Sequence, residues 1–186
     1  ALLLSLCTML TVVGCSNKAD TADNGAKDTL VVAQGSDPTS LDPYGTTDSP
    51  AIRVAHCVFE TLVTRDDEGN IAPMLAESWD IEDDCTYIFH LRKGVKFHNG
   101  EELKASDVAF TFHKFMTEGV PQFRIVYKGA SVRAIAPLTV RIELSEPNKE
   151  NMLSLFSLPV MPESFWKKHK LSDPLSTPPL AGGPYP

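Results

Sequence analysis

The sequence has few basic residues and no basic cluster. Its 186 residues include 17 Lys and Arg against 24 Asp and Glu, for a formal net charge of −7, and the pI is near 5.2. No run of Lys or Arg is longer than the pair Lys167 and Lys168. Because tight nucleic-acid binding requires a basic surface, this composition argues against a nucleic-acid partner. With 42% hydrophobic and 22% charged residues, the chain is typical of a globular domain.

The sequence also lacks the short motifs of common catalytic sites. The GxSxG, HExxH, GxxxxGKS/T and GxGxxG signatures are absent, and no pair of carboxylates stands out as a general acid and base. We therefore expect no catalytic residues, no cofactor and no enzymatic activity. The aromatic residues fall at strand and helix spacings that favour a core over a ligand cleft, the set being Trp79, Tyr87, Phe89, Phe97, Phe110 and Phe112.

Metal-ligand spacings are missing as well. No CxxC pair and no His/Cys cluster with zinc spacing occurs, so we predict no metal site. A site that draws on several scattered histidines stays open as the alternative: His56, His90, His98, His113 and His169. Of the four cysteines, Cys57 and Cys85 lie in the body of the chain, and whether they form a disulfide is also left open.

The first 17 residues carry no charged side chain, and the apolar run within them is too short to span a bilayer as a helix. Such a run is typical of a secretory signal peptide. It ends in Val12-Val13-Gly14-Cys15, which resembles a bacterial lipobox. We interpret residues 1–14 as a truncated lipoprotein signal peptide and Cys15 as the lipidated first residue of the mature chain. An ordinary signal-peptidase site beside an unrelated cysteine is the alternative.

The remaining pattern predicts a mixed α/β domain. Ser49 and Pro50 favour a helix start with Ser49 as N-cap, and Ser106 favours a second one. Alternation and turn residues predict strands at 30–33, 77–81, 86–91, 131–136 and 139–144. Helical spacing predicts a further short helix at 148–156. Alternation predicts that strand 86–91 has one apolar face, formed by Tyr87, Phe89 and Leu91.

Six sequence blocks in this order resemble the N-terminal part of the family 5 extracellular solute-binding proteins, the peptide- and nickel-binding receptors of ABC importers. The blocks are Leu41-Asp42-Pro43, Phe59-Glu60-Thr61-Leu62-Val63, residues 73–79, residues 87–100, Ala105-Ser106-Asp107-Val108 and Gly183-Pro184-Tyr185. Residues 117–124, 158–162 and 178–180 further resemble the YejA-like, oligopeptide-binding branch. One departure is Cys85, where the family usually has glycine, so that turn is expected to be strained or differently shaped.

The resemblance implies an α/β fold of the periplasmic-binding-protein type II class, with two lobes that close by a hinge. On that map, residues 15–28 are a flexible tether and residues 29–186 are the N-terminal part of the solute-binding domain. This part comprises only the first lobe and its inserted subdomain, at about residues 44–174.

The resemblance implies a substrate-binding lipoprotein that captures oligopeptides or peptide-like compounds and delivers them to an ABC permease and its ATPase. It would be anchored by lipid in the periplasm or at the extracytoplasmic face of a bacterial membrane. A nickel or haem carrier of the same fold is one alternative, and a secreted hydrolase with its active site elsewhere is another.

The resemblance also implies which residues contact ligand. In peptide-binding relatives, the segment just before the first helix offers backbone groups to the peptide, and this places Thr46, Thr47, Asp48 and Ser49 there. Ser49 has a competing role as helix N-cap, and Asp48 can instead favour the helix N-terminus electrostatically. Phe123, in the block 117–124, is the remaining ligand-binding candidate.

Overall fold

The computed structural model describes residues 31, 33–40, 42, 44, 47–147, 158–171 and 182, and for residues 122, 123 and 126 it describes the backbone alone. The helices are α1 (Ser49–Val58), α2 (Ala105–Glu118), α3 (Pro121–Arg124) and α5 (Glu163–Trp166), with a 3-10 turn, η1 (Ile125–Tyr127). The strands are β1 (Val63–Arg65), β2 (Ile71–Pro73), β3 (Ala76–Ile81), β4 (Thr86–Leu91), β5 (Ser131–Ala136) and β6 (Thr139–Glu143). All of them belong to one unit, residues 34–186.

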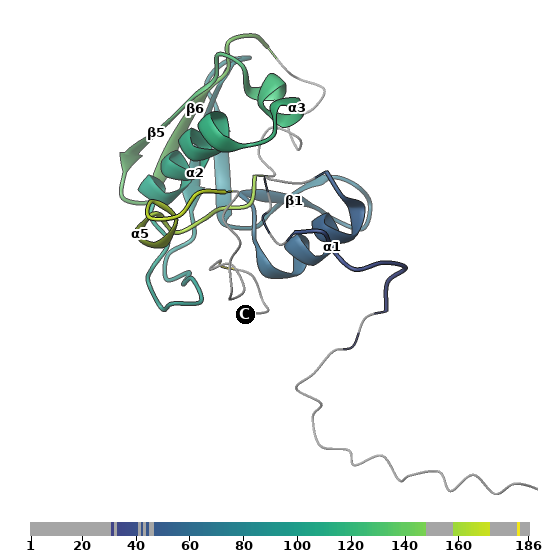
Figure 1. Cartoon of the computed structure of the whole chain (residues 1–186). Coiled ribbons are helices and arrows are strands. Elements are labelled where there is room, and N and C mark those ends of the chain that lie inside the picture. Colours follow the sequence, from purple (N-terminus) through teal and green to yellow (C-terminus); the bar gives the residue numbers. More distant parts are fainter. Residues whose placement is uncertain are drawn as a thin grey trace, which may run out of the picture. The chain divides into compact units, whose positions relative to one another are not determined.

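The centre of this unit is a four-stranded antiparallel sheet in the order β3-β4-β6-β5. Helix α2 lies across one face of this sheet, against β5 and β6 (Figure 1). Phe89 of β4 lies opposite Trp79 of β3 and Val140 of β6, so one row of apolar side chains crosses the sheet beneath the helix. Strands β1 and β2 form a separate two-stranded antiparallel ribbon.

Most of the expected strands are confirmed, because their period-two alternation depends only on neighbouring residues. The segments predicted at 77–81, 86–91, 131–136 and 139–144 correspond to β3, β4, β5 and β6. Tyr87, Phe89 and Leu91 are buried, as predicted, and Ile88 on the opposite face of β4 is buried as well. Ile88 pairs with Asp80 on one side and Arg141 on the other, and the long apolar stem of an arginine can cover a neighbour in this way.

The strand expected at 30–33 is not formed at the two described residues of this range, 31 and 33. Residues 30 and 32 lie outside the described part of the chain, while Val31 and Ala33 have no regular structure and Val31 is 87% exposed. A β-branched run becomes a strand only when a neighbour satisfies its backbone groups, and no pairing partner for residues 31 and 33 occurs among the described residues. The helix expected at 148–156 and the tether at 15–28 lie outside the described residues.

Both helix starts differ from the prediction, the N-cap of α1 by one residue and that of α2 by two. Helix α1 begins at Ser49 itself and Asp48 is the N-cap, so the expected N-cap role of Ser49 is wrong. Helix α2 begins at Ala105, before Ser106, because Asp107 stabilises the first turn: its Oδ2 accepts a hydrogen bond from the Lys104 backbone N–H at 2.9 Å. The Oδ1 of Asp107 accepts the Glu163 N–H at 2.9 Å, so one carboxylate joins the starts of α2 and α5.

The buried face of α2 closes the core. Val108, Phe112 and Phe115 face the core at helical spacing, as predicted. The segment 158–162, which leads into α5, packs on this helix through Thr111. The buried hydroxyl of Thr111 accepts a hydrogen bond from the Met161 N–H at 2.9 Å and donates one to the Met161 carbonyl at 3.3 Å.

We expect Thr111→Val to lower the free energy of unfolding by about 1–3 kcal/mol, because valine keeps the shape but leaves the buried Met161 amide without its hydroxyl partner. Urea unfolding of the chain measures the effect. Thr117→Val is the matched control, since this exposed threonine on the same helix bonds only carbonyls of its own helix, such as that of His113 at 3.0 Å. Equal losses in the two variants would contradict the assigned role of Thr111.

Candidate ligand-binding segment

The candidate ligand-contacting residues lie where a loop enters α1. Thr47 and Ser49 are exposed and Asp48 is half-buried. The backbone of Asp48 is extended, with φ −70° and ψ 122°. Thr46 lies outside the described residues. Immediately before the helix, the segment therefore combines an exposed residue, Thr47, with an extended backbone at Asp48.

Asp48 holds this segment at its C-terminal end. Its carboxylate Oδ2 lies 3.2 Å from the backbone N–H and 3.4 Å from the hydroxyl of Thr39, and both groups donate to it. Its carbonyl accepts the Ile52 N–H at 3.0 Å, which is the first bond of α1. Its side chain makes no capping bond to the helix. Asp48 therefore closes the loop from residue 39 to residue 48, and its charge also lies near the positive end of the helix dipole.

Tyr44 holds the segment at its N-terminal end. The side chain is buried, and its ring lies 4.9 Å from the ring of Phe115 on α2. Its backbone N–H donates to Asp42 Oδ1 at 2.8 Å, and its hydroxyl donates to the carbonyl of Pro159. Burial, with smaller contributions from Tyr127 and Asp42, raises the pKa of Tyr44 well above its ordinary value, so the hydroxyl keeps its proton.

Helix α3 is joined to the same residue. The Tyr44 carbonyl accepts the N–H of Val120 at 3.1 Å, and Val120 directly precedes α3. Phe123 lies in α3, where only its backbone is described. The structure thus connects, through Tyr44, the two stretches of sequence that contain the candidate ligand-binding residues.

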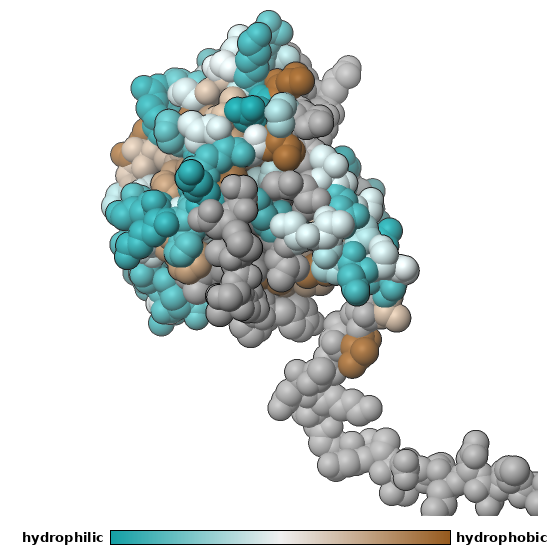
Figure 2. Space-filling view, viewed as in Figure 1, coloured by the Kyte–Doolittle hydropathy of each residue, from teal (hydrophilic) through white to brown (hydrophobic). Residues whose placement is uncertain are grey.

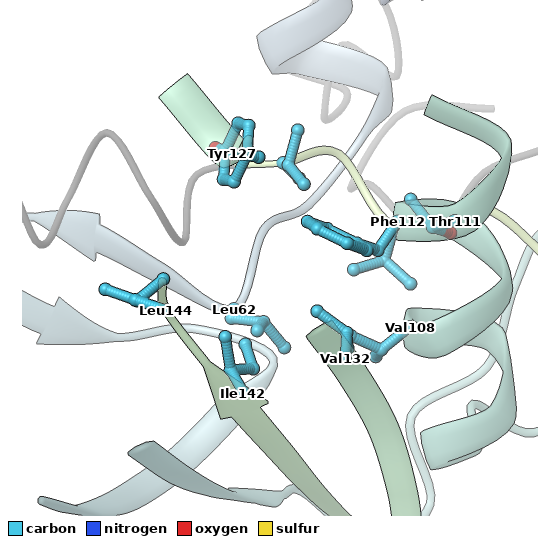
Figure 3. A pocket seen from close by; sticks show the side chains of 10 residues that line it. Leu62, Val108, Thr111, Phe112, Tyr127, Val132, Ile142 and Leu144 are labelled. Atoms are coloured by element: carbon cyan, nitrogen blue, oxygen red, sulfur yellow. The ribbon is translucent and has the colours of Figure 1, made fainter. Parts of the chain in front are cut away.

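A small apolar pocket lies between α2 and the sheet. Side chains of α2, β5 and β6 point into it from opposite sides, among them Val108, Phe112, Val132 and Ile142 (Figure 3). Its free volume is about 20 Å³, roughly the space for one water molecule. Such a volume cannot hold a peptide, so this pocket is a gap in the core packing and not a ligand site.

The other sequence-based interpretations concern the core, metals and cysteines. Tyr87, Phe89, Phe97 and Phe112 are buried in the core, as expected, with the half-buried Trp79 and Phe110 packed against them. Within the described ranges, no group of three or more His, Cys, Asp or Glu residues is placed to hold a metal ion. His90, for example, is 2.8 Å from the carboxylate of Asp80.

The cysteines of the body do not pair. Cys57, on α1, and Cys85 are both free thiols, so the disulfide left open by the sequence is not formed. The turn at Cys85 is not strained by a left-handed backbone, since no described residue other than glycine has a positive φ. Asp83 shapes this turn instead, because its carboxylate accepts the Cys85 N–H at 2.8 Å and lies 3.2 Å from the Thr86 hydroxyl. These bonds lower the pKa of Asp83, and the bond from the Cys85 N–H contributes most.

The described surface carries only single apolar side chains. The face in Figure 2 is mostly hydrophilic or neutral, with a few separate hydrophobic residues. Among the described residues of this unit, the large exposed hydrophobics are Ile81, Ile125 and Ile135, each on a different element. No helix in the described part of the chain combines the length and the apolar character needed to cross a bilayer.

The match to a family is direct. Residues 70–186 match the model of the family described as "Bacterial extracellular solute-binding proteins, family 5 Middle". This chain belongs to the family 5 bacterial extracellular solute-binding proteins.

Individual relatives agree with this assignment. The chain is 56% identical over 148 residues to YejA of Escherichia coli (strain K12), a protein described as uncharacterized, and the match covers 78% of this chain and 24% of YejA. It is 40% identical over 91 residues to the periplasmic oligopeptide-binding protein OppA of Haemophilus influenzae, with 48% of this chain and 17% of OppA covered. The chain therefore spans about a quarter or less of the length of these relatives.

Solved structures confirm the α/β periplasmic-binding-protein fold. The structure of Haemophilus influenzae OppA in complex with the peptide RPPGFSPFR has a TM-score of 0.69 and 27% identity, covering 80% of this chain and 33% of OppA. NikZ of Campylobacter jejuni in complex with Ni(L-His) has a TM-score of 0.67 and 25% identity, covering 80% of this chain and 30% of NikZ. The chain thus corresponds to part of that fold.

The sequence interpretation did not single out the residues that hold the candidate segment. Thr39, Asp42 and Tyr44 were not identified, although Asp-Pro-Tyr at 42–44 is a usable signal: an Asp side chain that bonds the N–H two residues on is a common turn. The contacts of Tyr44 with Val120 and Pro159 leave no local sequence signal, because they join residues far apart in the chain.

Proposed function

We propose that this chain is part of the substrate-binding component of an ABC importer that captures oligopeptides outside the cytoplasmic membrane and delivers them to the permease. The observation that carries the proposal is the exposed Thr47 next to the extended backbone of Asp48, at the entry to α1. An extended peptide can be recognised through its backbone by such a segment, regardless of its side chains. Membership of the family and the peptide named for OppA support the peptide as ligand.

Backbone recognition has an energetic consequence. Each hydrogen bond contributes only about 0.5–1.5 kcal/mol net, so one segment cannot supply micromolar affinity by itself. The remaining contacts must come from the rest of the binding cleft when the lobes close on the ligand. In this scheme, residues 46–49 and Phe123 are one wall of the cleft, and inserted subdomain residues 44–174 support them.

The proposal is tested with the protein expressed from the complete reading frame, unfolded and refolded to remove bound ligand. Isothermal titration with RPPGFSPFR and with a mixture of tripeptides should give dissociation constants in the micromolar range or below. The similarity to NikZ makes Ni(L-His) the specific competitor to titrate in parallel. Binding of Ni(L-His) without any binding of peptides would replace the peptide proposal with the nickel alternative.

The N-terminal residues complete the proposal. We place Cys15 at the lipid-modified start of the mature protein, residues 15–28 as its tether, and the protein at the extracytoplasmic face of the membrane. We also expect no enzymatic activity, because the family is described by solute binding. The assignments of Cys15, the tether and the membrane location rest on the sequence pattern at residues 1–28, which lie outside the described structure.

A further inference from the structure

Tyr44 uses each of its polar groups to join a different part of the unit. Its N–H bonds Asp42, its carbonyl bonds Val120 ahead of α3, and its hydroxyl bonds Pro159. Its ring packs on Phe115 of α2. We propose that Tyr44 is a positioning residue for ligand binding, which sets the location of the segment 46–49 relative to α3; this rests on the function proposed above.

The partner of the hydroxyl is itself firmly held. The next residue, Val160, donates its N–H to the carbonyl of Glu60 at 2.9 Å. Met161 follows, and both its N–H and its carbonyl are hydrogen bonded to the Thr111 hydroxyl. The hydroxyl of Tyr44 therefore ends on a segment fixed to α2 and to the residues that follow α1. A hydrogen bond to a fixed segment can hold Tyr44 in place, whereas a hydrogen bond to a mobile loop could not.

The geometry limits how far the candidate segment can move. Tyr44 and Asp48 are four residues apart, and Asp48 is held separately by Thr39 and by the first bond of α1. A residue spans at most about 3.6 Å, so Thr47 stays within roughly 11 Å of the Tyr44 Cα atom. These contacts restrict the positions of Thr47 and Asp48 before ligand arrives, and this restriction reduces the ordering cost of binding.

Removing the hydroxyl should release one end of the segment while keeping the ring in the core. In the protein expressed from the complete reading frame, we expect Tyr44→Phe to weaken the affinity for RPPGFSPFR and for tripeptides by a similar factor, about 5- to 30-fold. In the ligand-free protein, we expect amide hydrogen exchange at Tyr44 and Val120, whose N–H groups bond Asp42 and the Tyr44 carbonyl, to become at least about 5-fold faster. Both measurements are made well below the melting temperature of the variant.

Thr86→Val is the matched control. It also removes the hydroxyl of a buried residue, but this hydroxyl bonds the Asp83 carboxylate at 3.2 Å, in the turn between β3 and β4, and not the segment 158–162. We expect it to leave peptide affinity and amide exchange at Tyr44 and Val120 unchanged. If Tyr44→Phe behaves like Thr86→Val in both measurements, Tyr44 only stabilises the fold and the positioning role is wrong.

The two readouts separate this inference from the proposed function. If the unmutated protein binds no peptide, the proposed ligand is wrong, and amide exchange at Tyr44 and Val120 in Tyr44→Phe still decides whether the hydroxyl holds this residue in place. If the unmutated protein binds peptide and only Tyr44→Phe loses affinity and protection, the positioning role is supported. Faster exchange with unchanged peptide affinity would overturn it, because the held segment would then not matter for binding.

Discussion

Replacing Thr47 with proline is expected to reduce peptide affinity by at least about 100-fold, whereas Thr47→Ala should change it by less than about 2-fold. Proline deletes the backbone N–H, fixes φ, and also restricts the residue before it. Alanine removes only the exposed side chain of Thr47 and leaves the backbone able to pair with the ligand. The contrast between the two variants therefore tests whether the segment binds through its backbone.

The measurement is titration calorimetry with RPPGFSPFR in the protein from the complete reading frame, with thermal unfolding recorded for each variant. Thr47 is exposed and precedes α1, so proline should leave the core intact. A well-folded Thr47→Pro variant that binds peptide normally would remove residues 46–49 from the binding site. A large loss in Thr47→Ala would instead show that the side chain contacts the ligand.

Replacing Cys15 with serine is expected to move the protein from the membrane fraction to the soluble fraction and to reduce incorporated lipid label by at least about 10-fold. Lipid attachment at a lipobox requires the cysteine thiol, and a single acyl chain gives only marginal membrane binding, so a stable anchor requires more than one chain. Cell fractionation and labelling with a radioactive fatty acid measure both effects.

Cys7→Ser provides the control for this experiment. Cys7 is a cysteine of the apolar leader and lies before the proposed cleavage site, so its replacement should leave the label unchanged. If Cys15→Ser still fractionates with the membrane and carries undiminished label, the lipobox interpretation is wrong, and the ordinary signal-peptidase alternative replaces it.

The candidate site was only partly accessible from sequence. The resemblance to the family located residues 46–49 in front of a helix, whereas in the structure Thr47 and Asp48 precede α1 and Ser49 is its first residue. Whether these residues contact ligand stays a prediction. The role of Ser49 as N-cap was wrong by one residue, since helix propensity differs little between adjacent polar residues. Asp48 is the N-cap in the structure, and its carboxylate is also bonded to Thr39, nine residues earlier.

The sequence by itself determined the strands and helix faces that depend on near neighbours. Alternation along residues 86–91 and 139–143 and helical spacing of Val108, Phe112 and Phe115 are local patterns, and each element formed where its pattern lies. Only the tertiary structure decided which residue holds the candidate segment. The Tyr44 hydroxyl meets the Pro159 carbonyl across 115 residues of chain. No periodicity or spacing encodes such a pair, because it arises when separate elements pack and each buried polar group must find a partner.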